Sequence, residues 1–244
     1  MNERRIDCHA LFNEWVEMNS TQNYWREEQA FIIIRMIESI EFKNLTVVDL
    51  GCHAGGLSEY LLKSLKNVKI IGIDSNPFLL MIYRNHLAEY RDKFSLLLGD
   101  MREEGTIRKA GHFDAVVSLT SFADLSRQSI LGIYRRLYES LPEHGLFANA
   151  DIITFSNDWF ETLHYSAKAK KPIIDINVFW DGIKKKYGIA NEIDEMNALT
   201  RVGDIPEHGY QPSFYVNSLR WAGFQTVDIV FQAGNRIVYC GKKV

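Results

Sequence analysis

A glycine-containing loop between an apolar segment and an amphipathic segment is the part of this sequence best suited to hold a ligand. It runs VVDLGCHAGG over residues 47–56, with Asp49, Gly51 and Gly55 at its turn. Glycine lets a ligand touch the backbone, because no Cβ stands in the way. Asp74 ends the next apolar segment, 25 residues after Asp49. In a parallel α/β sheet, a carboxylate at that place binds the ribose hydroxyls of an adenosine-containing cofactor.

The same loop departs from the pattern that binds a dinucleotide. Dinucleotide enzymes carry GxGxxG here, with the helix N-terminus facing a pyrophosphate. In this chain Cys52, His53 and Ala54 follow Gly51, so the middle glycine is missing, and Asp49 would repel the anion. A cofactor with a positive sulfonium and an amino acid tail suits the loop better. An NAD-linked oxidoreductase and a non-catalytic cofactor-binding module are the less favoured alternatives.

Alternating apolar and amphipathic stretches must position this loop. Buried strands are expected at LTVVDL, VKIIGID, FSLLLGD, FDAVVSL and GLFANADII. Helices are expected over residues 56–65, 77–90, 127–140 and 213–222. Continuous apolar strands indicate a parallel sheet with both faces covered. After Gly223, two further strands joined at Ala233-Gly234 predict a hairpin. The predicted fold is α/β, with a Rossmann-like sheet of about seven strands, mostly parallel, that ends in an antiparallel hairpin.

Composition divides the chain into a core and two additions. Residues 45–153 and 213–244 carry the alternating pattern and are predicted to form the core. Residues 1–44 are predicted to form an N-terminal helical segment that is part of a lid. The pattern breaks over residues 154–212, where Trp, Lys, Gly and Pro recur, and this segment is predicted to be an inserted cap for the substrate.

Charge and composition exclude several classes of protein. The chain is 46% hydrophobic and 24% charged with a net charge of −3, which is typical of a folded globular domain and offers no basic field for nucleic acid. No apolar stretch approaches the ~18 residues of a membrane helix, and the N-terminus has no apolar leader. Three scattered cysteines suit neither a disulfide framework nor a metal site. We therefore expect a cytoplasmic protein without a metal or a membrane partner.

The motifs together resemble those of the class I S-adenosylmethionine-dependent methyltransferases, over roughly residues 45–152 and 213–242. Asp49-x-Gly51-x-x-x-Gly55 is similar to the first motif of that family. The segments IIGID, LLLGDM, FDAVVSL and LPEHGLFANAD are similar to its second to fifth motifs and follow in the same order. The resemblance implies the class I methyltransferase sheet, with helices on both faces, and S-adenosylmethionine as the cofactor.

The resemblance also implies roles for residues at the strand ends. Asp74 would hold the ribose, Asp100 would accept the adenine amino group, and Met101 would pack on the adenine ring and offer its backbone N–H. The chain at Leu119 would contact the amino acid end of the cofactor, and the glycine loop would pass beneath its methionine part. The family usually has glycine at the position of His53. The expected cofactor set at these motifs is Gly51, Cys52, His53, Asp74, Ser75, Asp100, Met101 and Leu119.

A narrower resemblance connects FNEWV, KKKYG and the closing LRWAGFQTVDIVFQAGNRIVYCGKK to the branch that contains carboxy-S-adenosylmethionine synthase. Members of that branch bind the extra carboxylate of their product with an arginine of the insertion. Asn197 falls near that position here, and the nearest arginine along the insertion is Arg201. This departure favours ordinary methyl transfer.

Residues outside the core motifs complete the candidates. Tyr24 and Arg26 could close over the cofactor carboxylate, although Tyr24 and Trp25 could instead serve helix packing. Asp74 could alternatively cap the helix that follows it. Substrate contacts are expected at Phe122, Trp159, His164 and His208. No pair of acidic and basic residues in the sequence identifies a catalytic base. In-line methyl transfer from a sulfonium needs a base only if the acceptor must first lose a proton.

These observations predict in-line transfer of a methyl group from S-adenosylmethionine to a small-molecule acceptor. An RNA-modifying enzyme is one alternative, in which the lysines at 168, 170, 171 and 184–186 would grip phosphates. A carboxy-S-adenosylmethionine-related enzyme is another. The protein could act as a homodimer.

Overall fold

The computed structural model describes residues 6–41, 44–157, 159, 174–191, 193–194 and 209–244. The helices are α1 (Cys8–Gln22), α2 (Arg26–Glu38), α3 (Gly56–Ser64), α4 (Pro77–His86), α5 (Glu104–Lys109), α6 (Arg127–Ser140), α8 (Ile176–Tyr187) and α10 (Pro212–Ala222), with a 3-10 turn at Ala88–Tyr90. The strands are β1 (Leu45–Leu50), β2 (Val68–Asp74), β3 (Phe94–Leu98), β4 (Ala115–Leu119), β5 (Leu146–Ile152), β6 (Thr226–Ala233) and β7 (Arg236–Lys242).

The strands form one seven-stranded sheet in the order β3-β2-β1-β4-β5-β7-β6. β1 lies near the centre, and Val47 pairs in parallel with Ile70 of β2 and with Ala115 of β4. β7 runs antiparallel to both β5 and β6. The predicted α/β fold, mostly parallel with a C-terminal antiparallel hairpin, is therefore confirmed. The carboxyl ends of β1 to β5 meet at one edge of the sheet, where ligands bind in folds of this kind.

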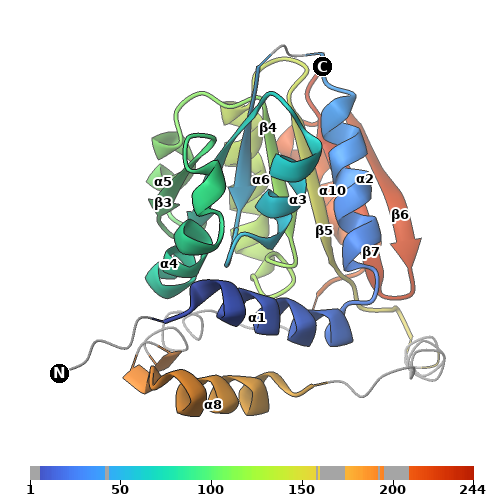
Figure 1. The fold of residues 1–244 in the computed structure, drawn as a ribbon. Coiled ribbons are helices and arrows are strands. Elements are labelled where there is room, and N and C mark those ends of the chain that lie inside the picture. Colours follow the sequence, from blue (N-terminus) through green and yellow to red (C-terminus); the bar gives the residue numbers. More distant parts are fainter. Residues whose placement is uncertain (1–5, 42–43, 158, 160–173, 192, 195–208) are drawn as a thin grey trace.

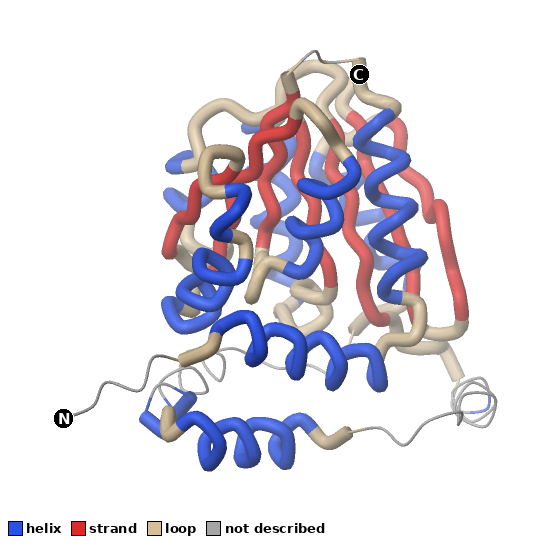
Figure 2. Tube along the Cα trace, viewed as in Figure 1, coloured by secondary structure: helices blue, strands red, loops and turns tan. Residues whose placement is uncertain are grey.

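Helices cover both faces of the sheet, as Figure 2 shows. On one face α2, α3 and α4 pack apolar side chains such as Ile33, Leu61 and Tyr83 against the strands. On the other face α5, α6 and α10 do the same, through a core that includes Tyr134 and Tyr215. Strands covered on both faces must be apolar throughout, which is why the central strands were recognisable as continuous hydrophobic runs.

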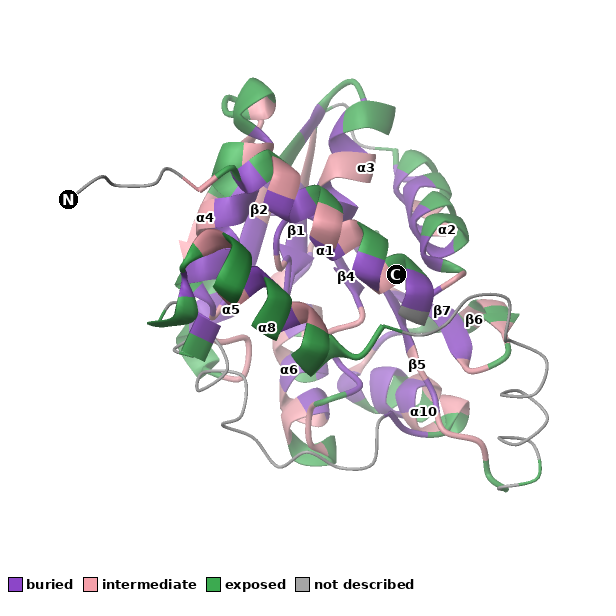
Figure 3. Ribbon diagram, turned by 60° about the horizontal axis from the view of Figure 1, so that its bottom comes forward, coloured by how far each residue is buried: buried purple, intermediate pink, exposed green. Residues whose placement is uncertain are grey.

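The N-terminal helix α1 lies across the edge where the parallel strands end, and α8 lies outside it (Figure 1). Apolar residues of α1, including Leu11 and Phe12, pack with Phe78 of α4 and with Trp180 of α8. Figure 3 looks toward this edge and shows buried positions of α1 close to the sheet, with exposed positions on α8. The first helical segment thus covers the ligand-binding edge.

Gly223 ends α10, as expected, with φ of +115°. The cap of α4 is Asn76, not Asp74, and Asn76 accepts the N–H groups of Phe78 and Leu79. The helix expected over 77–90 ends at His86 and continues only as the 3-10 turn. Two helices, α5 and α8, had no sequence prediction. None of the helices that the structure describes is long and apolar enough to cross a membrane.

Candidate functional site

The glycine loop leaves β1 in a conformation that few side chains would permit. Gly51 has φ of +72°, and its N–H and that of Cys52 both donate to the Ile73 carbonyl, at 2.8 and 3.0 Å. A Cβ on Gly51 would lie 2.9 Å from Met101 Cε and closer still to the side chain of Ser121. Glycine is therefore required here both by the positive φ and by the close approach of two neighbouring loops.

Asp74 stands at the end of β2 and ties the glycine loop to the start of α4. Its Oδ2 accepts the His53 N–H at 2.9 Å, and its Oδ1 accepts the Asn76 N–H at 2.9 Å. Asn76, and not Asp74, caps the helix, while Ser75 between them is half-buried. Each oxygen of this buried carboxylate accepts one of these backbone hydrogen bonds, so it keeps lone-pair capacity for a further donor. The local geometry thus leaves the carboxylate free to accept further hydrogen bonds from the two hydroxyls of a ribose.

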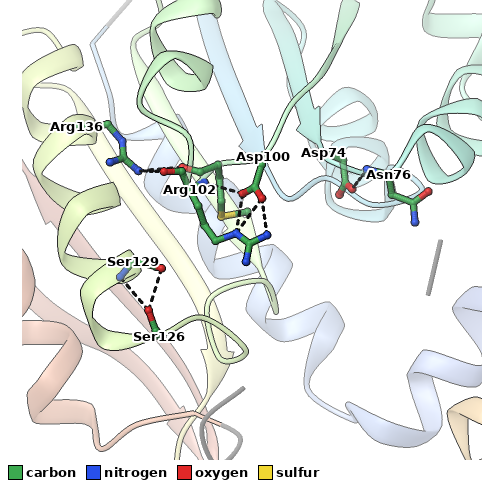
Figure 4. A network of polar contacts seen from close by, with 8 residues as sticks. Asp74, Asn76, Asp100, Arg102, Ser126, Ser129 and Arg136 are labelled. Atoms are coloured by element: carbon green, nitrogen blue, oxygen red, sulfur yellow. Dashed lines mark hydrogen bonds and ion pairs between the residues drawn. The ribbon is translucent and has the colours of Figure 1, made fainter. Parts of the chain in front are cut away.

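Asp100 follows β3 and carries a contact that the sequence did not predict. Arg102 donates to it from its backbone N–H at 2.8 Å and from Nε at 2.9 and 3.0 Å (Figure 4). Burial acts to raise the Asp100 pKa, but the hydrogen bonds from Arg102 outweigh it and hold the pKa below its ordinary value. Arg136 of α6 donates to the carbonyls of Met101 and Arg102, at 3.0 and 3.2 Å. The turn after β3 is therefore held rigid from two sides.

Arg26 is a buried cation beside the glycine loop. Its side chain, at the first position of α2, lies over the Trp15 ring at 5.5 Å, and a Cβ on Gly56 would stand 3.0 Å from its Nη2. Within the part of the chain that the structure describes, the guanidinium donates no hydrogen bond and forms no ion pair. Burial lowers the Arg26 pKa to about 10, although the nearby Asp49 and Tyr60 act in the opposite direction.

Asp49 lies beneath the loop and is 1% exposed. Ser58 of α3 donates to its Oδ2 at 2.6 Å. Burial raises the Asp49 pKa to about 7, against the lowering effect of the Ser58 hydrogen bond and of Arg26. This acid fixes the start of α3 through its hydrogen bond from Ser58, and its ionised form would favour a cationic ligand above the loop.

The loop after β4 forms the opposite wall of the site. Leu119 is buried at the strand end, and Thr120 takes φ of +61° while its N–H donates to Ala150 at 2.7 Å. Ser121 then turns back and donates its hydroxyl to the Gly51 carbonyl at 3.1 Å. Ser121 was missed by sequence reasoning, because only the pairing of β1 with β4 brings it to the glycine loop.

Phe122 has a different environment from the one expected of a substrate contact. It is 0% exposed, and its ring packs against Tyr134 and Phe147, at 5.6 and 5.7 Å between centroids. Its backbone N–H donates to the buried carboxylate of Asp151 at 2.9 Å. The side chain thus belongs to the core beneath the loop.

The other predicted contacts are dispersed. Tyr24 is half-buried in the turn between α1 and α2, and Trp25 packs edge-on against Phe231 at 6.0 Å. Trp159 is 62% exposed. His164 and His208 lie outside the described residues, as do Asn197 and Arg201. Gly51, Asp74, Asp100 and Met101, in contrast, gather at one edge of the sheet together with Arg26, Trp15 and Ser121.

The family model for a methyltransferase domain matches residues 47–145. The carboxy-S-adenosyl-L-methionine synthase of Campylobacter lari is 23% identical over 203 residues, which cover 82% of this chain and 78% of the relative. A malonyl-[acyl-carrier protein] O-methyltransferase of Acetivibrio thermocellus is 25% identical over 62% of this chain and 50% of its own length.

Solved structures share the fold. The CurJ carbon methyltransferase superposes with a TM-score of 0.61 at 14% identity, over 97% of this chain and 61% of its own. Human N-acetylserotonin methyltransferase, solved in complex with S-adenosylmethionine, gives 0.58 at 13% identity, over 94% of this chain and 55% of its own. The chain thus spans little more than half the length of these methyltransferases. The matching domain model and the fold make this chain similar to the class I S-adenosylmethionine-dependent methyltransferases, one of which was solved with S-adenosylmethionine.

Proposed function

We propose that this protein transfers a methyl group from S-adenosylmethionine to a small-molecule acceptor bound between the loop after β4 and the lid formed by α1. The observation that carries the proposal is the buried guanidinium of Arg26 beside the glycine loop, which has no hydrogen-bond or ion-pair partner among the described residues. A buried charge without a partner is costly, so a site that retains one is built for an anion. The carboxylate of the cofactor's methionine part is that anion.

The remaining cofactor contacts follow from this anchor. With its carboxylate on Arg26, the cofactor would extend over Gly51 and His53 and direct its ribose to Asp74. The adenine would reach Asp100 and Met101, since Gly99 N–H donates to the Asp74 carbonyl at 3.0 Å and keeps the two acids on adjacent strand ends (Figure 4). Asp49 beneath the loop would favour the sulfonium.

The chain's own residues would act mainly by orientation. The bound cofactor supplies an activated methyl group, and holding an acceptor in line can provide roughly 7–11 kcal/mol of acceleration. The wall formed by Leu119, Thr120 and Ser121 would fix the acceptor, and α1 would exclude water. The relatives support methyl transfer as the reaction, because the malonyl-[acyl-carrier protein] enzyme and the CurJ enzyme are an O- and a carbon methyltransferase by name.

The carboxy-S-adenosylmethionine synthase of Campylobacter lari supports a second candidate, because its similarity extends over most of both chains. Calorimetry with four ligands separates the candidates. We expect S-adenosylmethionine and S-adenosylhomocysteine to bind, carboxy-S-adenosylmethionine to bind more weakly, and NAD not to bind. A preference for the carboxylated cofactor would contradict methyl transfer. Binding to RNA that falls steeply with salt would instead favour an RNA substrate.

A further inference from the structure

His53 occupies the glycine loop in a backbone conformation that disfavours its own side chain. Its φ is +50°, a region that residues other than glycine enter at a cost. The backbone is held there by the hydrogen bond from the His53 N–H to Asp74 at 2.9 Å. A strained residue at the centre of a binding loop is a candidate for a functional role, provided that its side chain reaches the reacting groups.

The imidazole reaches the acceptor side of the loop. Its Nε2 lies 3.5 Å from Ser121 Oγ, at the limit of a hydrogen bond, and Ser121 belongs to the wall formed after β4. Trp15 of α1 closes the other side of the ring, edge-on at 6.1 Å between centroids. The ring is half-buried between these elements. It therefore stands where the glycine loop, the wall and the lid converge.

The charges around the ring suit a proton acceptor. Burial lowers the His53 pKa below its ordinary value, and Arg26 of α2 acts in the same direction. Asp74 of β2 and Asp124 of the loop after β4 act against them by favouring the imidazolium. Burial and Arg26 therefore favour the neutral imidazole, and the two carboxylates would stabilise the cation as it forms.

We propose that His53 is the general base of this methyltransferase and that the acceptor is a small molecule with an acidic hydroxyl, a phenol or an enol. The inference rests on the proposed function. An oxygen lone pair of the acceptor forms the new O–C bond, and the methyl–sulfur bond breaks with its electron pair going to sulfur. The acceptor's hydroxyl proton moves to His53 Nε2. The products are a methyl ether, a neutral thioether and an imidazolium, which returns its proton to water.

The acidity of the hydroxyl follows from the strength of the base. Proton transfer is most effective when the donor and acceptor have comparable pKa values, and burial makes His53 a weaker base than a free imidazole. An alkyl alcohol would hold its proton too strongly, whereas an amine attacks with a lone pair that needs no prior deprotonation. Phenols and enols hold their hydroxyl proton less strongly than alkyl alcohols, yet still benefit when a base removes it.

The test compares wild type with His53→Gly and His53→Asn, since glycine and asparagine both tolerate positive φ and the fold is retained. The acceptor probe is phenol, whose hydroxyl has a pKa of about 10 and stays protonated at pH 7, and product is measured as S-adenosylhomocysteine. Roughly a hundredfold or greater loss of kcat is expected in both variants, with little change in KM. Added imidazole should restore part of the rate in His53→Gly, because the missing ring leaves room for it. His144→Gly is the matched control and should retain the rate within a few-fold, because His144 also has a positive φ, +66°, but is exposed in the turn before β5.

Three results would overturn the inference: no methylation of phenol by wild type, equal rates in wild type and His53→Gly, or loss of rate without rescue by imidazole. Cofactor affinity, measured on the same samples, keeps the two proposals apart. Failure of wild type to bind S-adenosylmethionine would refute the proposed function itself. Normal cofactor binding with no effect of His53 would refute only the role of the base.

Discussion

Replacing Arg26 with methionine is expected to affect stability and binding in opposite directions. The guanidinium is 9% exposed and its pKa falls to about 10, a drop that corresponds to roughly 3 kcal/mol of destabilisation by the buried charge. At pH 7 arginine is charged in both the folded and the unfolded chain, so this cost is fully present. Methionine keeps an apolar contact with Trp15 and loses a cation–π interaction of about 1–2 kcal/mol. The cofactor-free variant should therefore unfold with a free energy about 1–2 kcal/mol higher than wild type.

The same substitution should weaken the binding of S-adenosylmethionine. Leaving the cofactor's carboxylate without its buried partner is expected to cost about 2–5 kcal/mol, or roughly thirtyfold to several thousandfold in Kd. Thermal unfolding measures the first effect, as a rise of a few degrees in Tm, and calorimetry measures the second. Arg35→Met is the matched control, because Arg35 lies on the same helix with an exposed side chain that pairs with Glu38. Unchanged affinity in a folded Arg26→Met variant would refute the assignment of the carboxylate to Arg26.

Asp74→Asn should weaken S-adenosylmethionine binding about tenfold to several hundredfold while the fold persists, since charge-assisted hydrogen bonds contribute about 1.5–3 kcal/mol each; calorimetry on the folded variant checks this. Gly51→Ala should abolish cofactor binding, because its Cβ would collide with Ser121, whereas Gly105→Ala should bind normally, since a Cβ there meets nothing within 4 Å. Asp49 has a pKa raised by burial to about 7, so from its unfolded pKa near ~4 up to about 7 the folded chain keeps a proton that the unfolded chain loses. The unfolding free energy should consequently fall as pH rises across that window, and denaturant titrations of Asp49→Asn should show a flatter pH profile than wild type.

Local patterns were enough to predict the sheet and much of the cofactor edge. The strands β1, β2, β4 and β5 carry the apolar runs that a sheet covered on both faces requires, whereas β3, expected to be buried, is an edge strand without a buried residue. The positive φ of Gly51 and Gly55 explains why glycines recur after β1. Asp74 is the last residue of β2 and Asp100 lies two residues beyond β3, so their common edge follows from the parallel pairing of these strands. Helix α5 escaped prediction because six residues are too few to establish a helical period.

The neighbours of the loop could not be predicted, because they depend on contacts between segments distant in sequence. Trp15 covers Arg26 and His53 only because α1 folds across the strand ends, and Ser121 meets Gly51 only through the pairing of β1 with β4. Phe122 was expected to contact substrate but is completely buried. The turn after β4 directs its side chain into the core instead of toward the site.

The sequence by itself thus determined the sheet, the glycine loop and the acids at its edge, because strand periodicity and turn chemistry act over a few residues at a time. Only the tertiary structure decided the partners of those residues: that Arg102 binds Asp100, that Arg26 is buried without a counterion among the described residues, and that the His53 ring meets Ser121. The reason is physical. Burial and charge pairing depend on the packing of distant segments, and no local pattern encodes them.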